Sequence, residues 1–354
     1  MSGLSLSTVL KPEPGWYSGD FHAHTTSSDG RYSPPELAAM AVERGLDFFA
    51  TTEHNTIDSY TRFGEDPGLL ILPGVEVTYT LGHWNVFGME GWQDWMEGIC
   101  GKHLSLVMPE GRTALELLQK ISSFGLLNSI NHPLLKPWAW EEGLTELRYV
   151  DCMEVWNDPY WPDNEQANPM AVAFWTTCLN QGYRITAIGG SDFHFLPGDT
   201  KYPGELIGLP RTYVYAEQLS GAAIVEGLRR RRAYLTMEPQ VTFQAQMGES
   251  AYEIGDDLGL VEGEIRFSGS VAQSPMASSV RVVKNGFTFS EASVSDDGGL
   301  IEAFDRASPA QPAWYRLEAT DASGKVIALT NPIFTGPQPT PTLHTFGEIL
   351  NSLS

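Results

Sequence analysis

The chain has 354 residues, of which 42% are hydrophobic and 19% charged, and its formal net charge is −22. This length suits one large domain followed by a smaller one, and so acidic a surface disfavours a nucleic-acid partner because it repels phosphate backbones. No apolar run is long enough for a membrane span, the N-terminus lacks the pattern of a secretory signal, and three scattered cysteines suggest idle thiols in a reducing compartment. We therefore expect a cytoplasmic protein without a membrane partner.

The first two-thirds of the chain alternates segments typical of strands and of helices. Capping boxes of the pattern Ser/Thr-x-x-Glu predict helices over residues 33–45 and 113–125. Further helices are predicted over 164–180 and 220–232, and strands are predicted over 46–52, 71–77, 84–88, 126–130, 150–155 and 184–189. This alternation indicates an α/β domain with a largely parallel sheet.

The sequence pattern changes near Pro239. Short alternating apolar runs follow, such as VTFQAQM and SVRVVKNGFTF, with turn signals at 285–286 and 297–299. No helical pattern interrupts them before a short tail near 345–352, and such runs are typical of a small all-β sandwich. We therefore divide the chain into an α/β domain over 1–238 and a β-sandwich domain with a C-terminal tail over 239–354.

Six of the eight histidines fall into five short segments, most of which follow a predicted strand. The segments are DFHAHTTSSDG (20–30), TEHN (52–55), GVE with GH (74–76 and 82–83), NHP (131–133) and GSDFH (190–194). In barrel-like α/β folds, functional sites are built at the carboxyl ends of the strands. Any one of these histidines could be an ordinary capping or core side chain, although a ligand role is favoured even singly, and six of them near carboxylates indicate a shared site.

The residue types in these segments are those of a divalent metal centre. Side chains alternate along an extended chain, so His22 and His24 point to the same side, and Asp192 and His194 repeat that spacing. Imidazole and carboxylate ligands without a thiolate suit Zn²⁺, Mn²⁺ or Fe²⁺. Such ions lower the pKa of a bound water to about 7 and polarise the bond under attack. The pattern therefore favours a metal-dependent hydrolase.

The five ordered segments resemble the motif series of the PHP (polymerase and histidinol phosphatase) superfamily over residues 16–235. The resemblance implies a distorted (βα)7 barrel that binds two or three divalent ions (Zn, Mn or Fe), with Glu76 bridging two of them. By motif position it implies these ligands: His22, His24, Glu76 and Asp192 for one ion, Glu76, His83 and His132 for a second, and Asp29, His54 and His194 for a third. Some family members carry a histidine near the position of Asp29. Glu76, Asp192 and His194 are also expected to be catalytic.

The order of the two parts resembles one branch of this superfamily. A barrel followed by a β-sandwich, with the link RAYLT (232–236) between them, is similar to carbaryl-hydrolase-like (CehA/McbA-type) proteins. The sandwich carries no pattern of catalytic residues. We expect it to pack against the barrel or to mediate homo-oligomerisation.

Basic side chains are scarce near the motifs, whereas aromatic ones are plentiful. A phosphate clamp would need Arg or Lys at the site, yet the basic run 229–232 lies at a predicted helix C-terminus, where cations interact well with the helix dipole. Aromatic residues next to the ligands are expected to line an apolar substrate pocket: Trp84, Trp138, Trp140, Phe193 and Phe195. For any single tryptophan among them, packing in the core or at an interface is the favoured interpretation.

From these residues we favour hydrolysis of a carboxylic, aryl or carbamate-type ester of a small, aromatic molecule by metal-bound hydroxide. Hydrolysis of a small phosphomonoester or phosphodiester is the alternative, which the superfamily as a whole favours. A non-catalytic, metal-stabilised binding module is a second alternative, and the intact ligand set argues against it.

Overall fold

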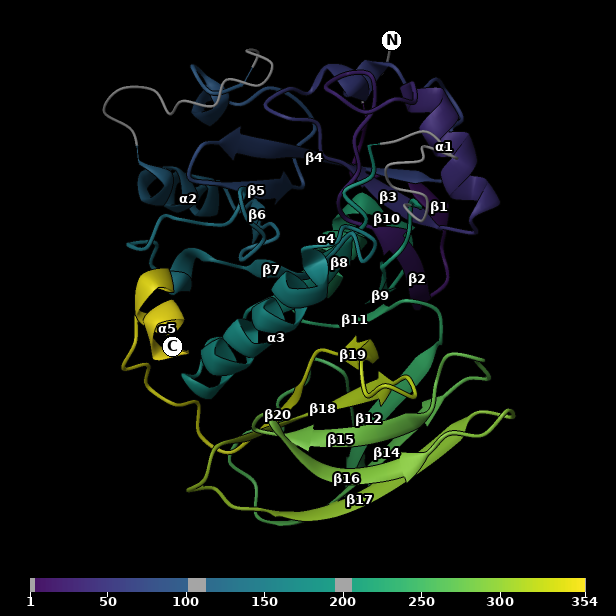
Figure 1. Cartoon of the computed structure of the whole chain (residues 1–354), viewed down its shortest axis with the longest axis vertical. Coiled ribbons are helices and arrows are strands. Elements are labelled where there is room, and N and C mark those ends of the chain that lie inside the picture. The colour runs from purple at the N-terminus through teal and green to yellow at the C-terminus, as the bar shows by residue number, and fades with distance from the viewer. Residues whose placement is uncertain (1–3, 101–112, 195–205, 354) are drawn as a thin grey trace.

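The computed structural model describes residues 4–100, 113–194 and 206–353. Figure 1 shows a curved sheet flanked by helices and, below it, a region built of strands alone. We call the first the barrel part, which comprises the described residues up to 236 and the C-terminal helix. We call the second, residues 241–335, the strand part.

The barrel part is built on a mixed sheet. Its strands are β2 (Gly15–Asp20), β3 (Phe48–Thr51), β4 (Leu70–Tyr79), β5 (Gly82–Phe87), β6 (Leu127–Ile130), β7 (Cys152–Asn157), β8 (Thr186–Gly190), β9 (Arg211–Ala216) and β11 (Ala233–Thr236). They are hydrogen-bonded in the order β11-β9-β2-β3-β4-β5-β6-β7-β8. The runs β2-β3-β4 and β6-β7-β8 are parallel, whereas the pairs β9–β2, β4–β5 and β5–β6 are antiparallel. A short β1 (Val9–Lys11) pairs separately with β10 (Leu219–Ser220).

The largely parallel sheet expected from the sequence is therefore a mixed one. Strand β4 turns directly into β5 through Thr80 and Leu81 without a helix, and strands joined so tightly run antiparallel. The sheet also curls until β8 lies beside β9. There Thr212 Oγ1 accepts a hydrogen bond from Gly189 N at 2.9 Å and donates one to Gly189 O at 3.0 Å. These side-chain bonds link β8, the last strand of the curled sheet, to β9.

The helices form in the segments where the sequence predicts them. They are α1 (Pro34–Glu43), α2 (Ala114–Ser123), α3 (Asn164–Asn180) and α4 (Gly221–Arg229), with α5 (Phe346–Ser352) near the C-terminus and 3-10 turns at Asp58–Thr61, Asp94–Met96 and Leu147–Tyr149. At the start of α2, Glu116 N donates to Thr113 Oγ1 at 3.2 Å, and Thr113 N donates to Glu116 Oε2 at 3.0 Å. This reciprocal pair satisfies two amides that the first helical turn leaves unbonded.

The strand part consists of two layers around a shared core. One layer is the sheet β13-β12-β14-β17, and the other is β16-β15-β18-β19 with β20 beside β18. The strands are β12 (Val241–Met247), β13 (Ser250–Glu253), β14 (Gly263–Val271), β15 (Ser279–Lys284), β16 (Phe287–Ser293), β17 (Gly299–Ala307), β18 (Ala313–Thr320), β19 (Val326–Thr330) and β20 (Ile333–Thr335). Buried Phe243 and Phe267 from the first layer and Val282 and Leu317 from the second belong to one apolar cluster.

The two parts share a sheet rather than only a contact surface. Strand β19 pairs antiparallel with β11, so the second layer of the strand part continues into the barrel sheet. Buried Asn331 reinforces this junction. Its Oδ1 accepts from Ala187 N at 2.8 Å, and its Nδ2 donates to Ala233 O at 3.0 Å. The predicted division at residue 238 falls between β11 and β12, but hydrogen bonds cross it.

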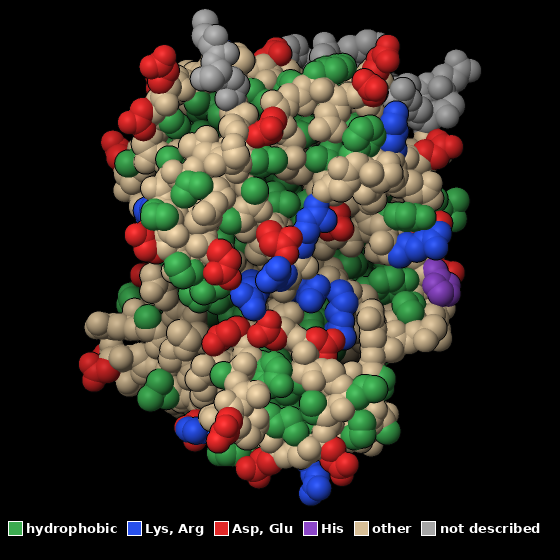
Figure 2. Space-filling model, turned by 180° about the vertical axis from the view of Figure 1, so that it is seen from behind, with side chains coloured by type: hydrophobic (Ala, Val, Ile, Leu, Met, Phe, Trp, Pro, Cys, Tyr) green, Lys and Arg blue, Asp and Glu red, His purple; other side chains and the backbone are tan. Residues whose placement is uncertain are grey.

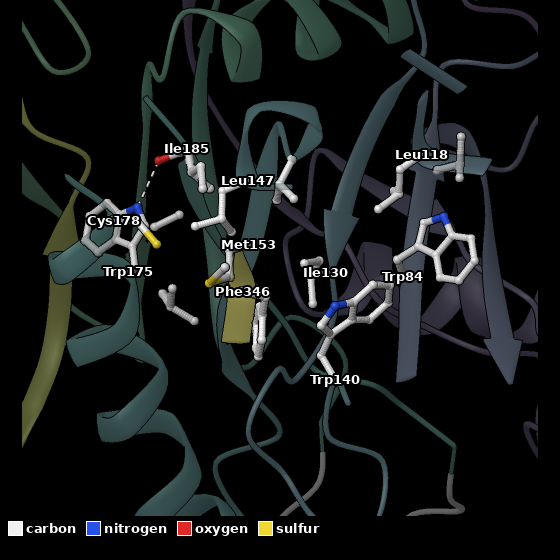
Figure 3. Close-up of a cluster of buried hydrophobic side chains, with 14 of the residues drawn as sticks. Trp84, Leu118, Ile130, Trp140, Leu147, Met153, Trp175, Cys178, Ile185 and Phe346 are labelled. Atoms are coloured by element: carbon white, nitrogen blue, oxygen red, sulfur yellow. Dashed lines mark hydrogen bonds between the residues drawn. The ribbon is translucent and has the colours of Figure 1, made fainter. Parts of the chain in front are cut away.

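The C-terminal tail, which the sequence analysis grouped with the sandwich, packs on the barrel part. Figure 1 shows α5 beside α3, and the rings of Phe346 and Phe174 lie 4.4 Å apart between centroids. Figure 3 shows Phe346 among the side chains of the largest core cluster, where Trp175 Nε1 donates to Ile185 O at 2.8 Å. Helix α5 is therefore a structural part of the barrel core.

Several basic side chains on the surface form ion pairs with carboxylates. Figure 2 shows Lys and Arg gathered across the middle of one face with Asp and Glu around them. In the basic run after α4, Arg230 pairs with Glu226 at 2.7 Å and Arg232 with Asp256 at 3.3 Å. Among the described helices, none combines the length and the apolar composition needed to cross a membrane.

We predict that Phe346→Ala destabilises the barrel part. Phe346 is 1% exposed, and removal of a buried phenyl ring typically costs about 3–5 kcal/mol of unfolding free energy. Chemical denaturation followed by tryptophan fluorescence measures the change. Phe287→Ala is the matched control, because Phe287 is 79% exposed and should change stability by less than about 0.5 kcal/mol. Equal losses in both variants would contradict the role of α5.

Candidate metal centre

The predicted ligands come together at one end of the barrel sheet. His22 and His24 follow β2, His54 follows β3, and the His132 segment follows β6. The rings of His22 and His24 lie 5.1 Å apart, as expected for alternate residues of an extended segment. Glu76 lies inside β4 rather than at its end, because β4 continues two residues further than predicted.

Glu76 lies at the centre of the cluster and is fully buried. Its Oε1 is 3.1 Å from His22 Nε2 and 3.3 Å from His83 Nδ1. Its Oε2 is 2.6 Å from His54 Nδ1. The two oxygens thus face different histidines, which supports the proposed role of Glu76 as a bridging ligand.

A second carboxylate, Asp192, faces the other side of the His22 and His24 pair. Its Oδ1 lies 3.2 Å from Nε2 of both rings. The ring of His24 also stacks on His194 at 4.1 Å and on His54 at 4.3 Å. Asp29 Oδ1 lies 3.2 Å from His194 Nε2 and 3.4 Å from His54 Nε2.

Among the described residues, three groups of atoms are each compact enough to hold an ion. Within each group the ligand atoms lie within 4.8 Å of one another, and the groups are His24, Asp29, His54 and His194; His22, His24 and Asp192; and His22, Glu76 and His132. The resemblance assigned His24 to the first ion alone, whereas here its ring adjoins two groups. His83 joins through its contact with Glu76.

The donor atoms fit divalent metal ions. Six buried atoms in the cluster have no hydrogen-bond partner among the described residues: His22 Nε2, His24 Nδ1, His24 Nε2, His83 Nδ1, His132 Nδ1 and Asp192 Oδ1. Buried polar atoms normally find a partner, so such a group of unpaired atoms facing one another indicates a missing cation. Imidazole and carboxylate donors without a thiolate suit Zn²⁺, Mn²⁺ or Fe²⁺.

Two of the predicted ligands have protonation states that suit metal binding. Burial raises the pKa of the Glu76 carboxyl, but the neighbouring histidines outweigh it and hold that pKa well below its ordinary value. Burial and the rings of His194 and His54 lower the pKa of His24 to about 3. Glu76 is therefore ionised and His24 neutral at pH 7, as metal ligands must be.

Local backbone strain is concentrated at the cluster. His132 and Asp192 have φ values of 27° and 52°, a left-handed conformation that side chains other than glycine rarely adopt. Gly190 lies just before Asp192, and a Cβ there would be 2.4 Å from His22 Cβ. Strained backbone of this kind tends to occur at functional sites, where surrounding structure holds it in place.

The sequence analysis missed the residues that hold the ligands in position. Glu154 is buried in β7, where its Oε1 lies 3.0 Å from His22 Nδ1 and its Oε2 accepts from His132 N at 2.8 Å. Asn131 donates to Glu76 Oε1 at 2.8 Å, and Thr78 Oγ1 lies 2.6 Å from His54 Nδ1. A charged residue inside the apolar strand VDCMEV was the available signal for Glu154.

A cavity of about 210 Å³ opens over the cluster. Its walls contain eight polar and three apolar side chains. The polar ones are Asp29, His54, His83, His132, Asn157, Asp158, Asp192 and His194, and the apolar ones are Leu135, Trp138 and Trp161. Asp158 is a carboxyl group outside the ligand set. No Lys or Arg lies among these described lining residues. This volume suits a small molecule or the end of a larger one.

The aromatic residues predicted to line the pocket lie mostly elsewhere. Trp84 and Trp140 are buried in the largest core cluster (Figure 3), and Phe193 is buried in another. Trp138 does line the cavity, and Phe195 lies outside the described residues. A position next to a ligand in the sequence does not distinguish an aromatic residue that lines the cavity from one buried in the core. Neighbouring side chains on an extended segment point to opposite faces, so the residue beside a ligand points away from it.

Comparisons with known proteins concern mainly the fold. No family model matches the chain. Among solved structures, a two-domain protein from Bacteroides vulgatus ATCC 8482, described as containing a predicted PHP-like metal-dependent phosphoesterase, is 17% identical with a TM-score of 0.50, over 93% of this chain and 99% of that one. This chain has the fold of that two-domain protein.

Two weaker similarities cover less of the chain. The lesion-specific endonuclease EndoQ from Pyrococcus furiosus is 14% identical with a TM-score of 0.41, over 61% of this chain and 56% of that one. A 5'-3' exoribonuclease from Haemophilus influenzae is 36% identical over 62 residues, which are 17% of this chain. The match spans 23% of the length of that exoribonuclease.

We predict that Glu154→Gln weakens metal binding by about 10–100-fold, since residues that orient metal-binding histidines usually contribute this much to affinity. Titration of the metal-free protein with Mn²⁺ and elemental analysis after dialysis measure the effect. Glu302→Gln is a control, because Glu302 lies on an exposed position of β17. Wild-type affinity in Glu154→Gln would show that Glu154 does not position His22.

We also predict that metal affinity rises with pH. Burial lowers the pKa of His194, but Asp29 and Asp192 outweigh it and raise that pKa to about 9. An ion must displace this proton, so affinity for Mn²⁺ should increase between pH 7 and 9, by up to about tenfold per pH unit. Calorimetry in buffers of different ionisation enthalpy measures the released proton. In His194→Gln the pH dependence should become shallower, and an unchanged slope would contradict the assignment.

Proposed function

We propose that this protein is a metal-dependent hydrolase of the PHP superfamily that cleaves a small phosphoester. The observation that carries this proposal is the cavity over nine histidine and carboxylate side chains, several of whose buried donor atoms lack partners. The description of the Bacteroides vulgatus protein, which shares the fold, supports phosphoester chemistry. Divalent ions bound there would activate a water molecule and neutralise charge on the group under attack.

The charge of the site supports an anionic substrate only when metals are present. The ligand groups contain three carboxylates, from Asp29, Glu76 and Asp192. Two or three divalent ions would bring four to six positive charges and leave the loaded cluster cationic. The lack of Lys and Arg among the described lining residues is then compatible with a phosphate substrate, because the ions take the place of a basic clamp.

The residues of the chain have separate tasks in this proposal. Glu154 fixes the His22 ring through its Nδ1, which leaves Nε2 to face the cluster. Asn157 donates to Asp192 Oδ2 at 3.3 Å and so leaves Oδ1 toward His22 and His24. Leu135 and Trp138 give the cavity an apolar wall that excludes water from one side.

Hydrolysis of an aryl or carbamate-type carboxylic ester is the second candidate. It is favoured by the apolar wall of Leu135, Trp138 and Trp161 and by the lack of cations among the described lining residues. The resemblance of the sequence to carbaryl-hydrolase-like proteins supports it too. Both candidates use an activated water, so the substrate alone separates them.

We predict that protein loaded with Mn²⁺ or Zn²⁺ hydrolyses 4-nitrophenyl phosphate or bis(4-nitrophenyl) phosphate faster than 4-nitrophenyl acetate or an aryl N-methylcarbamate. The nitrophenyl substrates share one leaving group, so their rates compare the electrophiles directly. Release of nitrophenolate is followed by absorbance, with chelation and metal restoration as the test of metal dependence. Glu76→Gln should lower kcat/KM by at least about 100-fold, because it removes the central ligand. Turnover of the carboxylic esters alone would overturn the phosphoesterase assignment.

A further inference from the structure

A carboxyl group outside the ligand set lines the same cavity. Asp158 follows β7 directly, is 5% exposed, and lines the cavity with Asp192 and His194. It belongs to none of the three groups of ligand atoms found among the described residues. Hydrolysis by activated water, as proposed above, gives this side chain no task.

The surrounding backbone holds Asp158 in one orientation. Tyr160 N donates to Asp158 Oδ1 at 3.0 Å. The carbonyl oxygen of Asp158 accepts from Trp161 N at 3.2 Å and from Asn164 Nδ2 at 3.0 Å. Among the hydrogen bonds of the described residues, none joins a donor to the second carboxyl oxygen, Oδ2, although the Trp161 amide also acts on the carboxyl group. One oxygen is therefore anchored, and the other is available to a molecule in the cavity.

The surroundings of Asp158 also favour its protonated form. Burial raises its pKa to about 7, and the charge of Asp192 acts in the same direction, whereas the amides of Tyr160 and Trp161 and the His194 ring lower it. An ordinary aspartic acid is almost entirely ionised at neutral pH. A proton donor works best when its pKa lies near the working pH, and in the metal-free protein the pKa of Asp158 meets this condition. The case for a proton donor therefore rests first on the position of Asp158 in the cavity and on its anchored carboxyl group.

We propose, resting on the phosphoesterase function above, that Asp158 is a catalytic residue that protonates the leaving oxygen of the substrate. Water adds its hydroxyl group to phosphorus and releases its proton to solvent. The bond between phosphorus and the ester oxygen breaks, and its electron pair stays on that oxygen. The proton of Asp158 moves to this oxygen to give an alcohol, and the Asp158 carboxylate regains a proton from solvent.

This role specifies the substrate class more closely. A phenolate with an electron-withdrawing group leaves without a proton, so such aryl esters gain little from a general acid. An aliphatic alkoxide is far more basic and needs a proton as the bond breaks. Asp158 therefore suits phosphoesters of aliphatic alcohols, such as a polyol or a sugar hydroxyl.

The test compares two leaving groups in the metal-loaded, full-length protein. We expect Asp158→Asn to lower kcat/KM for glycerol 2-phosphate by about 100- to 10,000-fold. For 4-nitrophenyl phosphate the loss should stay below about tenfold. Phosphate release measures both reactions, and the retained aryl activity shows that the variant is folded and binds metal.

Asp163→Asn is the matched control. Asp163 lies five residues away, is exposed, and makes no side-chain cap bond to α3, so both activities should remain at wild-type level. Equal losses on the two substrates, or no loss on either, would overturn the role of Asp158 while leaving the phosphoesterase function intact. A wild-type protein that cleaves only the aryl ester would also contradict it. Failure of the wild type on both phosphoesters would overturn the proposed function and this role together.

Discussion

A buried carboxylate determines the arrangement of the candidate metal centre. Glu76 has no exposed surface, and an ionised carboxylate removed from water costs several kcal/mol unless other groups compensate it. The compensation comes from five histidine rings within 3.7 Å of its oxygens: His22, His24, His54, His83 and His132. Four of those rings in turn have nitrogen atoms without a hydrogen-bond partner among the described residues, an arrangement that bound cations would satisfy: His22, His24, His83 and His132. The chain thus concentrates unfavourable burial at one point and relies on metal ions to offset it.

The strands bring these side chains together from distant parts of the sequence. The backbone and side chains around them are packed so closely that larger residues would not fit. Gly190 brings the backbone against His22 at a distance that a Cβ would not permit. His132 and Asp192 adopt left-handed backbone conformations, each of which costs about 1–3 kcal/mol. Ion binding to the folded state alone can offset such costs, because any ligand that prefers the native form stabilises it. Metal loading and stability of the barrel part are therefore linked.

Sequence reasoning succeeded where local chemistry decides the structure. The capping boxes at Ser33 and Thr113 open helices within one residue of the predicted start, and the HxH spacing orients His22 and His24 as expected. It was less informative where tertiary packing decides. Nothing local distinguishes Trp138, which lines the cavity, from Trp140, which is buried in the core. The strand pairing of β11 with β19 joins residues almost a hundred positions apart, and no periodicity in either strand specifies that partner.

Asp158 shows that a broader rule would have found more of the site. The predicted ligands are histidines and carboxylates in segments that contain a histidine, whereas Asn157 and Asp158 follow the predicted strand 150–155 with no histidine beside them. Both are small polar residues and both contribute to the cavity wall. A rule that includes the polar residues after every strand, with or without a neighbouring histidine, predicts both.

Helix α5 has a consequence for how the protein is made. Phe346 and Ile349 complete the core of the barrel part, yet they follow the entire strand part in the chain. During synthesis from the N-terminus, the barrel strands emerge first and must wait, with part of their apolar core uncovered, until these last side chains arrive. Multi-part proteins with such incomplete intermediates are prone to aggregate while they wait. The nascent chain is thus most vulnerable during translation of the strand part, when the barrel strands are already made and α5 is not.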